Sequence, residues 1–275
     1  MGSEMCIRDS INTGTFLQAL ALGVCVRKLG HNPVLVNYSR PHLRFVYLVK
    51  NVFRNQSKSF FRKGLSIINI SLEQILRMRL KHIVRKVIPM CSLNTLSKID
   101  DRNTIYMTGS DQVWNNEYNR GIDPVFYLDF APQHAKKIAY AASIGQNSLS
   151  DIEKESMRSA LKCYACLTVR EDLAKAQLTE LGYDSTQVLD PTLLLSKEEW
   201  LSVFKKSSFI KVEPFLLVYS VEWNNDDLIM KLAKDIASLR GLKIYVYSTS
   251  WNVKSVKCDK RFVLSLIHIS EPTRP

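Results

Sequence analysis

The sequence predicts an α/β fold with a mostly parallel sheet, and three observations lead to this prediction. Short apolar runs alternate along the chain with longer segments of helical periodicity. Several of the apolar runs end in Gly, Ser or Asp, as at residues 109–111 and 143–145. The hydrophobic content of 46% over 275 residues is ordinary for a globular protein that builds a core.

The first part of the chain contains the elements of one α/β domain, which we place at residues 11–205. The apolar runs predict strands over residues 33–37, 104–108, 137–142, 167–169 and 187–189. Helical periodicity predicts helices over residues 16–28, 73–88, 151–161, 171–181 and 198–204. Gly30 follows the first helix, where a glycine commonly ends one. A basic and mostly helical insertion is predicted at residues 42–98.

A second α/β unit begins after a charged stretch at residues 206–213, which we interpret as a linker. Its predicted elements are a strand at 215–219, a helix at 225–239 and a strand at 242–247. One apolar face of the helix is formed by Leu228, Leu232, Ile236 and Leu239. We place this unit at residues 214–263 and expect it to be truncated.

Both ends of the chain are expected to be foreign to the gene. Residues 264–274 read Leu-Ser-Leu-Ile-His-Ile-Ser-Glu-Pro-Thr-Arg. The reverse complement of one back-translation of that segment encodes Gly-Ser-Glu-Met-Cys-Ile-Arg-Asp-Ser, which is residues 2–10. The shared DNA resembles a transposase-type sequencing-library adapter. Residues 1–10 and 264–275 are therefore left out of the fold prediction.

The net charge of +12 is concentrated in the basic insertion. Residues 42–98 contain twelve Lys and Arg and one acid, Glu73, which gives +11 and leaves +1 for the rest of the chain. Such a block attracts anionic lipid or other polyanions, and peripheral contact with an anionic membrane is one hypothesis. The alternative is a variable helical insertion with a solvated basic face. No nucleic-acid motif accompanies the charge, so we expect no nucleic-acid partner.

From cysteine usage and hydropathy we expect a cytoplasmic protein. Peripheral contact with the inner face of the membrane is a further hypothesis. The cysteines show no disulfide framework, which indicates a reducing compartment, and no run of 18 apolar residues occurs. We interpret Cys163 and Cys166 as buried structural residues, because a single C-x-x-C pair is not a metal set. No histidine has metal or triad spacing, so we expect neither a metal nor another cofactor.

Four groups of motifs carry a resemblance to a known family. Residues 12–22 begin Asn-Thr-Gly-Thr-Phe-Leu-Gln-Ala, and residues 109–115 read Gly-Ser-Asp-Gln-Val-Trp-Asn. Residues 126–130 (Phe-Tyr-Leu-Asp-Phe) precede a Lys-Ile-Ala-Tyr-Ala-Ala-Ser-Ile-Gly block at 137–145. Val-Arg-Glu at 169–171 and Val-Leu-Asp-Pro-Thr-Leu-Leu at 188–194 complete the set. In order and spacing, residues 11–205 resemble the polysaccharide pyruvyl transferase family.

The resemblance implies a fold and a reaction. The fold is a Rossmann-like parallel-sheet domain followed by a second, here truncated, Rossmann-like domain, similar to B-type glycosyltransferases. The reaction transfers pyruvate from phosphoenolpyruvate onto a sugar of a cell-surface polysaccharide or its precursor, forming a pyruvate ketal and releasing phosphate. The family also carries a Ser-Phe-His-Gly-like segment with a catalytic histidine in its second domain. This chain does not contain that segment, so we expect it to be inactive by itself.

Such chemistry needs a cationic clamp for phosphate and carboxylate, together with an acid and a base. Arg170 follows a predicted strand and is the candidate anion clamp, and its alternative is an ion pair with Glu171 or Asp172. Asp111 is the candidate catalytic base, and its alternative is to cap the following helix. Trp114 is expected either to stack on a sugar face or to lie in the core.

The remaining candidate substrate-binding residues lie at predicted strand ends and at the start of the first helix. They are Asn12, Gly14, Gly109, Ser110, Ser143 and Gly145. Gly14 and Gly145 would allow close backbone approach, to a phosphate or to a neighbouring strand. Asp190, before Pro191, is interpreted as a turn or cap residue. Because parallel strands end on the same side of a sheet, we expect these strand ends to converge, joined by residues 12–15.

Two other functions remain open from the sequence. One is a glycosyltransferase-like enzyme that uses a nucleotide sugar on the same scaffold, which a ribose-binding acid in the second domain would favour. The other is a non-catalytic relative that binds a sugar or an anion.

Overall fold

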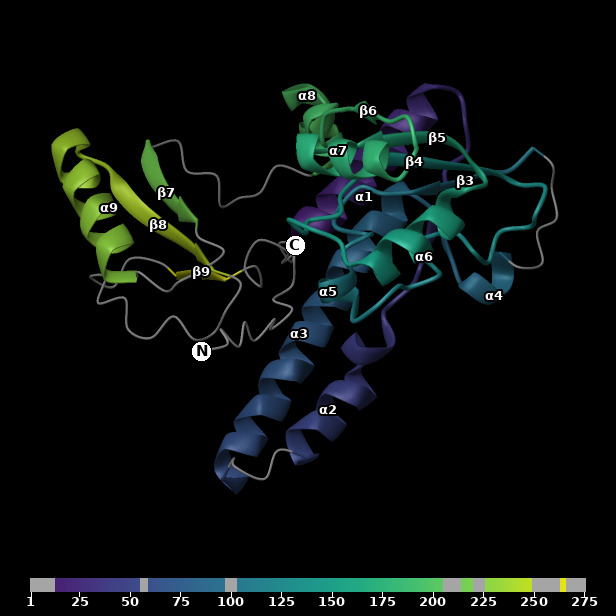
Figure 1. Cartoon of the computed structure of the whole chain (residues 1–275). Helices are drawn as coiled ribbons and strands as arrows, with labels where there is room; N and C mark the ends of the chain where they lie inside the picture. The colour runs from purple at the N-terminus through teal and green to yellow at the C-terminus, as the bar shows by residue number, and fades with distance from the viewer. Residues whose placement is uncertain are drawn as a thin grey trace. The chain divides into compact units, whose positions relative to one another are not determined.

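A computed structural model of the protein describes residues 13–54, 59–96, 103–204, 214–219, 226–248 and 263–265. The chain divides into two compact units, and Figure 1 labels the helices and strands of both. The first unit comprises residues 13–40 and 83–200, and the second comprises residues 1–12, 41–82 and 201–275. Most of the predicted basic insertion is thus grouped with the C-terminal residues and not with the first sheet.

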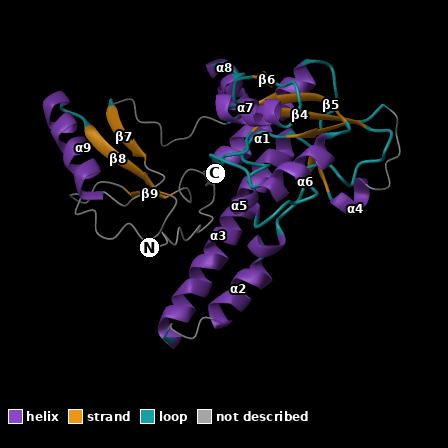
Figure 2. Cartoon of the chain, in the orientation of Figure 1, coloured by secondary structure: helices purple, strands orange, loops and turns teal. Residues whose placement is uncertain are grey.

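The first unit is built on a parallel sheet of four strands in the order β3-β4-β5-β6, which are labelled in Figure 1 and coloured orange in Figure 2. The strands are β3 Ile105–Thr108, β4 Lys136–Ala142, β5 Tyr164–Val169 and β6 Thr186–Gln187. Adjacent strands are parallel at every pairing, which confirms the predicted α/β class. A separate pair of short parallel strands, β1 Leu35–Val36 and β2 Met90–Cys91, belongs to the same unit.

Helices connect these strands, close to the predicted positions. They are α1 Thr13–Lys28, α4 Leu93–Leu96, α5 Asn116–Asn119, α6 Asp151–Leu161, α7 Asp172–Glu180, the 3₁₀ helix η2 Pro191–Leu193 and α8 Lys197–Val203. Helix α1 ends at Lys28, and Gly30 just after it has a φ of +87°, a conformation that glycine adopts readily. A capping box between Ser150 and Glu153 starts α6 and satisfies the backbone N–H groups of both residues.

The main core lies between the sheet and the helices α6 and α7. Met157 and Leu161 of α6 and Leu178 of α7 are fully buried in one cluster with Val169 of β5. Burying side chains of this size contributes ~1.5–3 kcal/mol each. This core fixes the positions of β4 and β5, and therefore of the residues that follow them.

Cys163 and Cys166 are exposed free thiols, so the prediction of a buried role is wrong. Successive residues of a strand point to opposite faces. Leu167 and Val169 face the core, and Cys166 therefore points away from it. Cys163 precedes β5 in the turn after α6.

Strand β4 bends just before its carboxyl end. Its pairing with β5 shifts register between Ala139 and Ala142, and Ala141 has a φ of +48°. The Thr168 hydroxyl of β5 spans the irregularity, because it accepts from Ala141 N at 3.0 Å and donates to Ala139 O at 2.9 Å. The side chain of Thr168 thus satisfies the two backbone groups that the bulge removes from the ladder.

The second unit contains a helical hairpin and a second parallel sheet. Its helices are η1 Pro41–Leu43, α2 Phe45–Arg54, α3 Phe60–Val87 and α9 Asp226–Arg240, and its strands are β7 Phe215–Tyr219, β8 Lys243–Ser248 and β9 Val263–Ser265. Helix α3 is continuous over 28 residues and runs past the boundary between the units at residues 82 and 83. The strand order is β7-β8-β9, and all pairings are parallel.

Helix α9 packs on its sheet with a different face from the one that its leucines suggested. Met230, Ala233 and Ala237 are its buried residues. The predicted apolar face is solvent-exposed, with exposed fractions of 68% for Leu228, 59% for Leu232, 38% for Ile236 and 84% for Leu239. The small side chains allow the helix to approach the sheet closely, whereas the leucine face meets no partner within the described residues.

Residues 1–10, the linker at 206–213 and residues 266–275 lie outside the described part of the chain. Of the adapter-like C-terminal segment, Leu264 and Ser265 lie in β9 and pair with β8. The predicted foreign origin of both ends stays a prediction. Among the described helices, none is long and apolar enough to cross a membrane.

Candidate functional site

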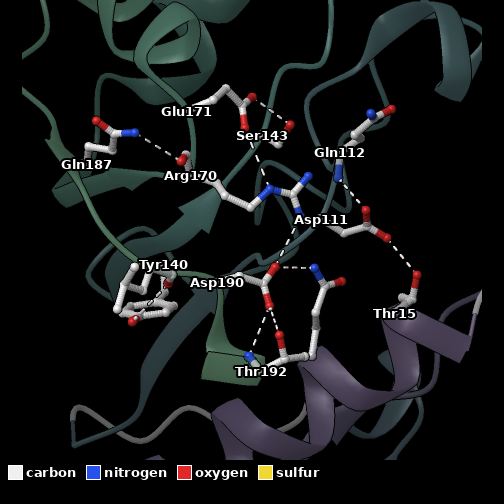
Figure 3. Close-up of polar contacts among 12 residues, drawn as sticks. Thr15, Asp111, Gln112, Tyr140, Ser143, Arg170, Glu171, Gln187, Asp190 and Thr192 are labelled. Atoms are coloured by element: carbon white, nitrogen blue, oxygen red, sulfur yellow. Dashed lines mark hydrogen bonds and ion pairs between the residues drawn. The ribbon is translucent and has the colours of Figure 1, made fainter. Parts of the chain in front are cut away.

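The carboxyl ends of β3, β4, β5 and β6 lie along one edge of the sheet, because the four strands are parallel. We call the residues that follow them, Asp111, Ser143, Arg170 and Asp190, the carboxyl edge. Figure 3 shows these residues together with Thr15 of α1. The predicted convergence of the strand ends, joined by the start of the first helix, is therefore present in the structure.

The backbone of Asp111 ties the first two strand ends together. Its carbonyl accepts from Ser143 N at 3.0 Å, and Asp111 pairs with Ala142 in an isolated parallel bridge. Its φ of +103° is uncommon for a residue with a side chain. Residues held in such conformations concentrate at functional sites.

The Asp111 carboxylate joins the start of α1 to the carboxyl edge. Its Oδ2 accepts from the Thr15 hydroxyl at 2.6 Å, and its Oδ1 accepts from Gln112 N at 2.9 Å (Figure 3). Asp111 does not cap the following helix, so that alternative is wrong. The N-cap of α5 is Asn115, whose side chain accepts from Tyr118 N at 2.8 Å.

Asp190 connects three segments of the chain. One carboxylate oxygen accepts from Gln18 Nε2 of α1 at 2.5 Å and lies 3.2 Å from Arg170 Nη1. The other accepts from the backbone and hydroxyl of Thr192, which confirms the predicted cap role at η2. Partial burial acts to raise the pKa of Asp190, but the hydrogen bonds from Thr192, Gln18 and Arg170 outweigh it, so the pKa lies below its ordinary value.

Arg170 lies between two carboxylates. Its Nη1 contacts Asp190, and its Nε lies 3.6 Å from Glu171 Oε2. The anticipated pairing with Glu171 is present, and the one with Asp190 was not anticipated. Neither contact uses the Nη2 amino group. The guanidinium therefore keeps donors for a further anion while Asp190 holds its orientation.

Glu171 organises the loop after β4. Its Oε1 accepts from the Ser143 hydroxyl at 2.6 Å and from Ile144 N at 3.2 Å. It occupies the N-cap position of α7 without a capping hydrogen bond from its side chain. Its carboxylate is directed to the neighbouring loop and couples the ends of β4 and β5.

The two strand-end glycines permit close approach of protein atoms. A Cβ at Gly109 would lie 2.0 Å from the Tyr140 carbonyl oxygen, and one at Gly145 would lie 2.7 Å from the Gln112 side chain. Close approach to the neighbouring strand β4 thus occurs at Gly109, for which it was not predicted, whereas Gly145 approaches the side chain of Gln112. Gly14 lies in the first turn of α1 and is half-buried, and Asn12 lies outside the described residues.

Three residues expected to bind substrate are too buried to touch one in this structure. Trp114 is fully buried, stacks on Tyr127 at 5.9 Å and meets Tyr164 edge-on, so the core alternative holds. Ser143 is 1% exposed, and its hydroxyl is engaged by Glu171. Ser110 is 7% exposed, and its hydroxyl has no hydrogen-bond partner among the described residues.

Sequence reasoning placed Thr15 in the joining segment without assigning it a partner, and it missed Gln18 and the linking role of Glu171. Thr15 and Gln18 are three residues apart on α1, so they share one face of the helix, and both reach carboxylates of the carboxyl edge. That spacing within the first motif is the signal that would have found them. Among the described residues, no group of three or more His, Cys, Asp or Glu side chains is placed to hold a metal.

The fold and this edge define a protein with an α/β scaffold that gathers one arginine and several carboxylates at the ends of parallel strands. The family model for polysaccharide pyruvyl transferase matches residues 12–260. The chain therefore belongs to the polysaccharide pyruvyl transferase family, a family of transferases that act in general by pyruvyl transfer to polysaccharide. No curated protein and no solved structure matched the chain.

Proposed function

We propose that the protein transfers the pyruvyl group of phosphoenolpyruvate onto two hydroxyls of a sugar in a cell-surface polysaccharide or its precursor. The two hydroxyl oxygens bond to C2 of phosphoenolpyruvate, and the bond from C2 to the phosphate oxygen breaks. One hydroxyl proton ends on the methylene carbon, which becomes a methyl group, and the other leaves with the phosphate. Family membership and the single arginine of the carboxyl edge, Arg170, support this proposal.

Arg170 is the proposed anion clamp. Phosphoenolpyruvate carries a phosphate and a carboxylate, and a planar guanidinium binds either group with two parallel hydrogen bonds. The contact with Asp190 restrains the guanidinium before substrate arrives, which lowers the entropy lost on binding. Asp190 is therefore proposed as a positioning residue for Arg170.

Asp111 is the proposed base for a sugar hydroxyl. Its side chain is only partly buried. Hydrogen bonds from the Thr15 hydroxyl and the Gln112 backbone N–H fix the orientation of its carboxylate. A base must lie within hydrogen-bond reach of the proton that it removes, and restraint of the carboxylate favours that geometry.

Asp111→Asn tests the base. Asn keeps the size of the side chain and tolerates a positive φ, so the fold should be retained. We expect kcat to fall by roughly 100-fold or more while the melting temperature changes little. A variant with unchanged kcat would remove Asp111 from the chemistry.

The assay for the reaction is phosphate release from phosphoenolpyruvate with a panel of sugar acceptors, using protein expressed from the native gene. Mass spectrometry of the acceptor identifies the acidic ketal. We expect acceptor-dependent phosphate release. Turnover of a nucleotide sugar without phosphate release from phosphoenolpyruvate would instead favour a glycosyltransferase on the same scaffold.

We also propose that the two sheets belong to two Rossmann-like domains arranged as in B-type glycosyltransferases.

A further inference from the structure

The helical hairpin of α2 and α3 exposes aromatic side chains where the two helices adjoin. Phe53 near the end of α2 is 58% exposed, and Phe60 and Phe61 at the start of α3 are 90% and 75% exposed. Lys63 Nζ donates to the Phe53 carbonyl at 3.5 Å, and Figure 1 shows α2 beside the first half of α3. Burial of a phenylalanine side chain contributes ~1.5–3 kcal/mol, so three exposed ones are not explained by the stability of the fold.

Basic residues neighbour these aromatics in the sequence. Arg54 lies in the last turn of α2, and Arg62 and Lys63 lie in the first turn of α3, which contains no acid. The helix dipole disfavours cations in a first turn. Helix stability therefore does not account for Arg62 and Lys63, whereas an external anion would. We call Phe53, Arg54, Phe60, Phe61, Arg62 and Lys63 the hairpin tip.

The apolar exposure continues along α3 from the hairpin tip. Leu65, Ile68 and Ile75 are 47%, 56% and 45% exposed, and their spacing from Phe61 places them on one face of the helix. The two helices α2 and α3 together contain nine Lys and Arg and one acid, Glu73. An apolar stripe within a strongly basic helical segment is the composition of helices that lie in a membrane interface.

We propose that the hairpin tip docks the protein on an anionic lipid surface. Phe53, Phe60 and Phe61 enter the boundary between headgroups and acyl chains, while Arg54, Arg62 and Lys63 contact lipid phosphates. Charge decides against a second copy of the chain as the occupant. Two copies would bring together segments that are both strongly basic, whereas an anionic membrane complements them. This inference goes beyond the proposed function and does not rest on it.

Vesicle flotation with the 275-residue chain tests the proposal. The chain is mixed with vesicles of phosphatidylcholine alone, or of roughly three parts phosphatidylcholine to one part phosphatidylglycerol. We expect binding to the anionic vesicles only, and a steep decrease as salt rises. Equal binding to both kinds of vesicle, or binding to neither, would overturn the proposal.

A matched pair of double variants locates the surface. Arg62→Gln with Lys63→Gln should weaken partitioning about 30-fold, because each charge near the membrane contributes ~1 kcal/mol. Arg85→Gln with Lys86→Gln removes the same charge at the other end of α3, roughly 35 Å along the helix and well beyond the Debye length. The second pair should change partitioning by less than about threefold. Equal losses in both pairs would mean that the tip has no special role.

Phe60→Trp tests insertion with a substitution that keeps an aromatic side chain at the hairpin tip. Its fluorescence should shift to shorter wavelength with anionic vesicles and be quenched by lipids with brominated acyl chains. No shift and no quenching would contradict insertion. Phe60→Ser with Phe61→Ser should reduce partitioning with an unchanged circular dichroism spectrum. Should that pair instead convert a dimer to a monomer and leave vesicle binding intact, the hairpin tip is an interface between copies.

Discussion

Asp190 brings together residues that are far apart in the sequence. Gln18 and Asp190 are separated by 172 positions, and Arg170 and Asp190 by 20. A buried or half-buried carboxylate needs several hydrogen bonds, and here they come from α1, from the end of β5 and from η2. Its role as a cap and its role as a partner of Arg170 are compatible, because each carboxylate oxygen serves one of them.

Arg170→Lys is the residue-scale test of the anion clamp. A lysine keeps the charge but cannot reproduce the planar two-donor contact. We expect a loss of about 1.5–3 kcal/mol in transition-state binding, which is tenfold or more in kcat/KM for phosphoenolpyruvate. Steady-state phosphate release measures it. Arg158→Lys is the control, since Arg158 pairs with Glu155 on the surface of α6, and it should behave as wild type.

The lowered pKa of Asp190 predicts a pH dependence of stability. The carboxyl of an unfolded Asp titrates near pH ~3.9. Because the folded pKa lies below the unfolded one, the stabilisation is present above the unfolded pKa and is lost as pH falls through the folded pKa. Denaturant unfolding of the wild type and of Asp190→Asn should therefore converge as the pH is lowered from about 5 to about 2. A constant difference across that range would show that the charge of Asp190 does not stabilise the fold.

At the scale of the element, the bulge in β4 sets the geometry of the carboxyl edge. Ala141 takes a positive φ, and Ala142 then reaches both Asp111 and Arg170 N through its pairings. Thr168 stabilises this irregular backbone from the adjacent strand. A strand without the bulge would direct residues 142 and 143 differently with respect to β3.

Thr168→Val tests the bulge. The valine fits the strand but leaves Ala141 N and Ala139 O without their side-chain partner. We expect a decrease of about 1–3 kcal/mol in the free energy of unfolding, measured in urea. Thr168→Ser keeps the hydroxyl and should lose less than about half as much. A loss in Thr168→Ser as large as the loss in Thr168→Val would show that the hydroxyl contributes no more to stability than the methyl group does.

At the scale of the molecule, the second unit exposes much apolar surface among its described residues. Besides the leucine face of α9, Phe215, Leu217 and Tyr219 of β7 are each about half exposed, at 45%, 55% and 55%. Exposed apolar surface of this kind promotes association. We therefore expect the 275-residue chain to be poorly soluble, and residues 11–205 to be the better-behaved piece.

Leu228→Gln with Leu239→Gln tests that expectation. Both leucines are largely exposed, so the pair should raise the soluble yield and change the denaturation midpoint little. Met230→Gln, at a position that is 6% exposed, is the contrasting control and should destabilise the unit by about 2 kcal/mol or more. A strong loss of stability in the leucine pair would show that this face is buried against another part of the protein.

The sequence by itself determined the local features of this protein. The local signals are the strand runs, Gly30 after the first helix, and the motifs at residues 109–115 and 188–194, each of which spans only a few positions. They were sufficient for the α/β class, for the family and for the expectation that the strand ends meet on one side. The hydrophobic periodicity and the turn residues depend on positions that are close in the sequence, so they can be recognised before the fold is known.

Only the tertiary structure decided which side chains are partners. It assigned Gln18 and Arg170 to Asp190, Thr15 to Asp111 and the helix cap to Asn115. It also buried Trp114 and exposed the leucine face of α9. The physical reason is that a hydrogen-bond partner or a packing face depends on where distant segments lie. A carboxylate takes whichever donors the fold brings within reach, and the spacing of residues along the chain does not specify them.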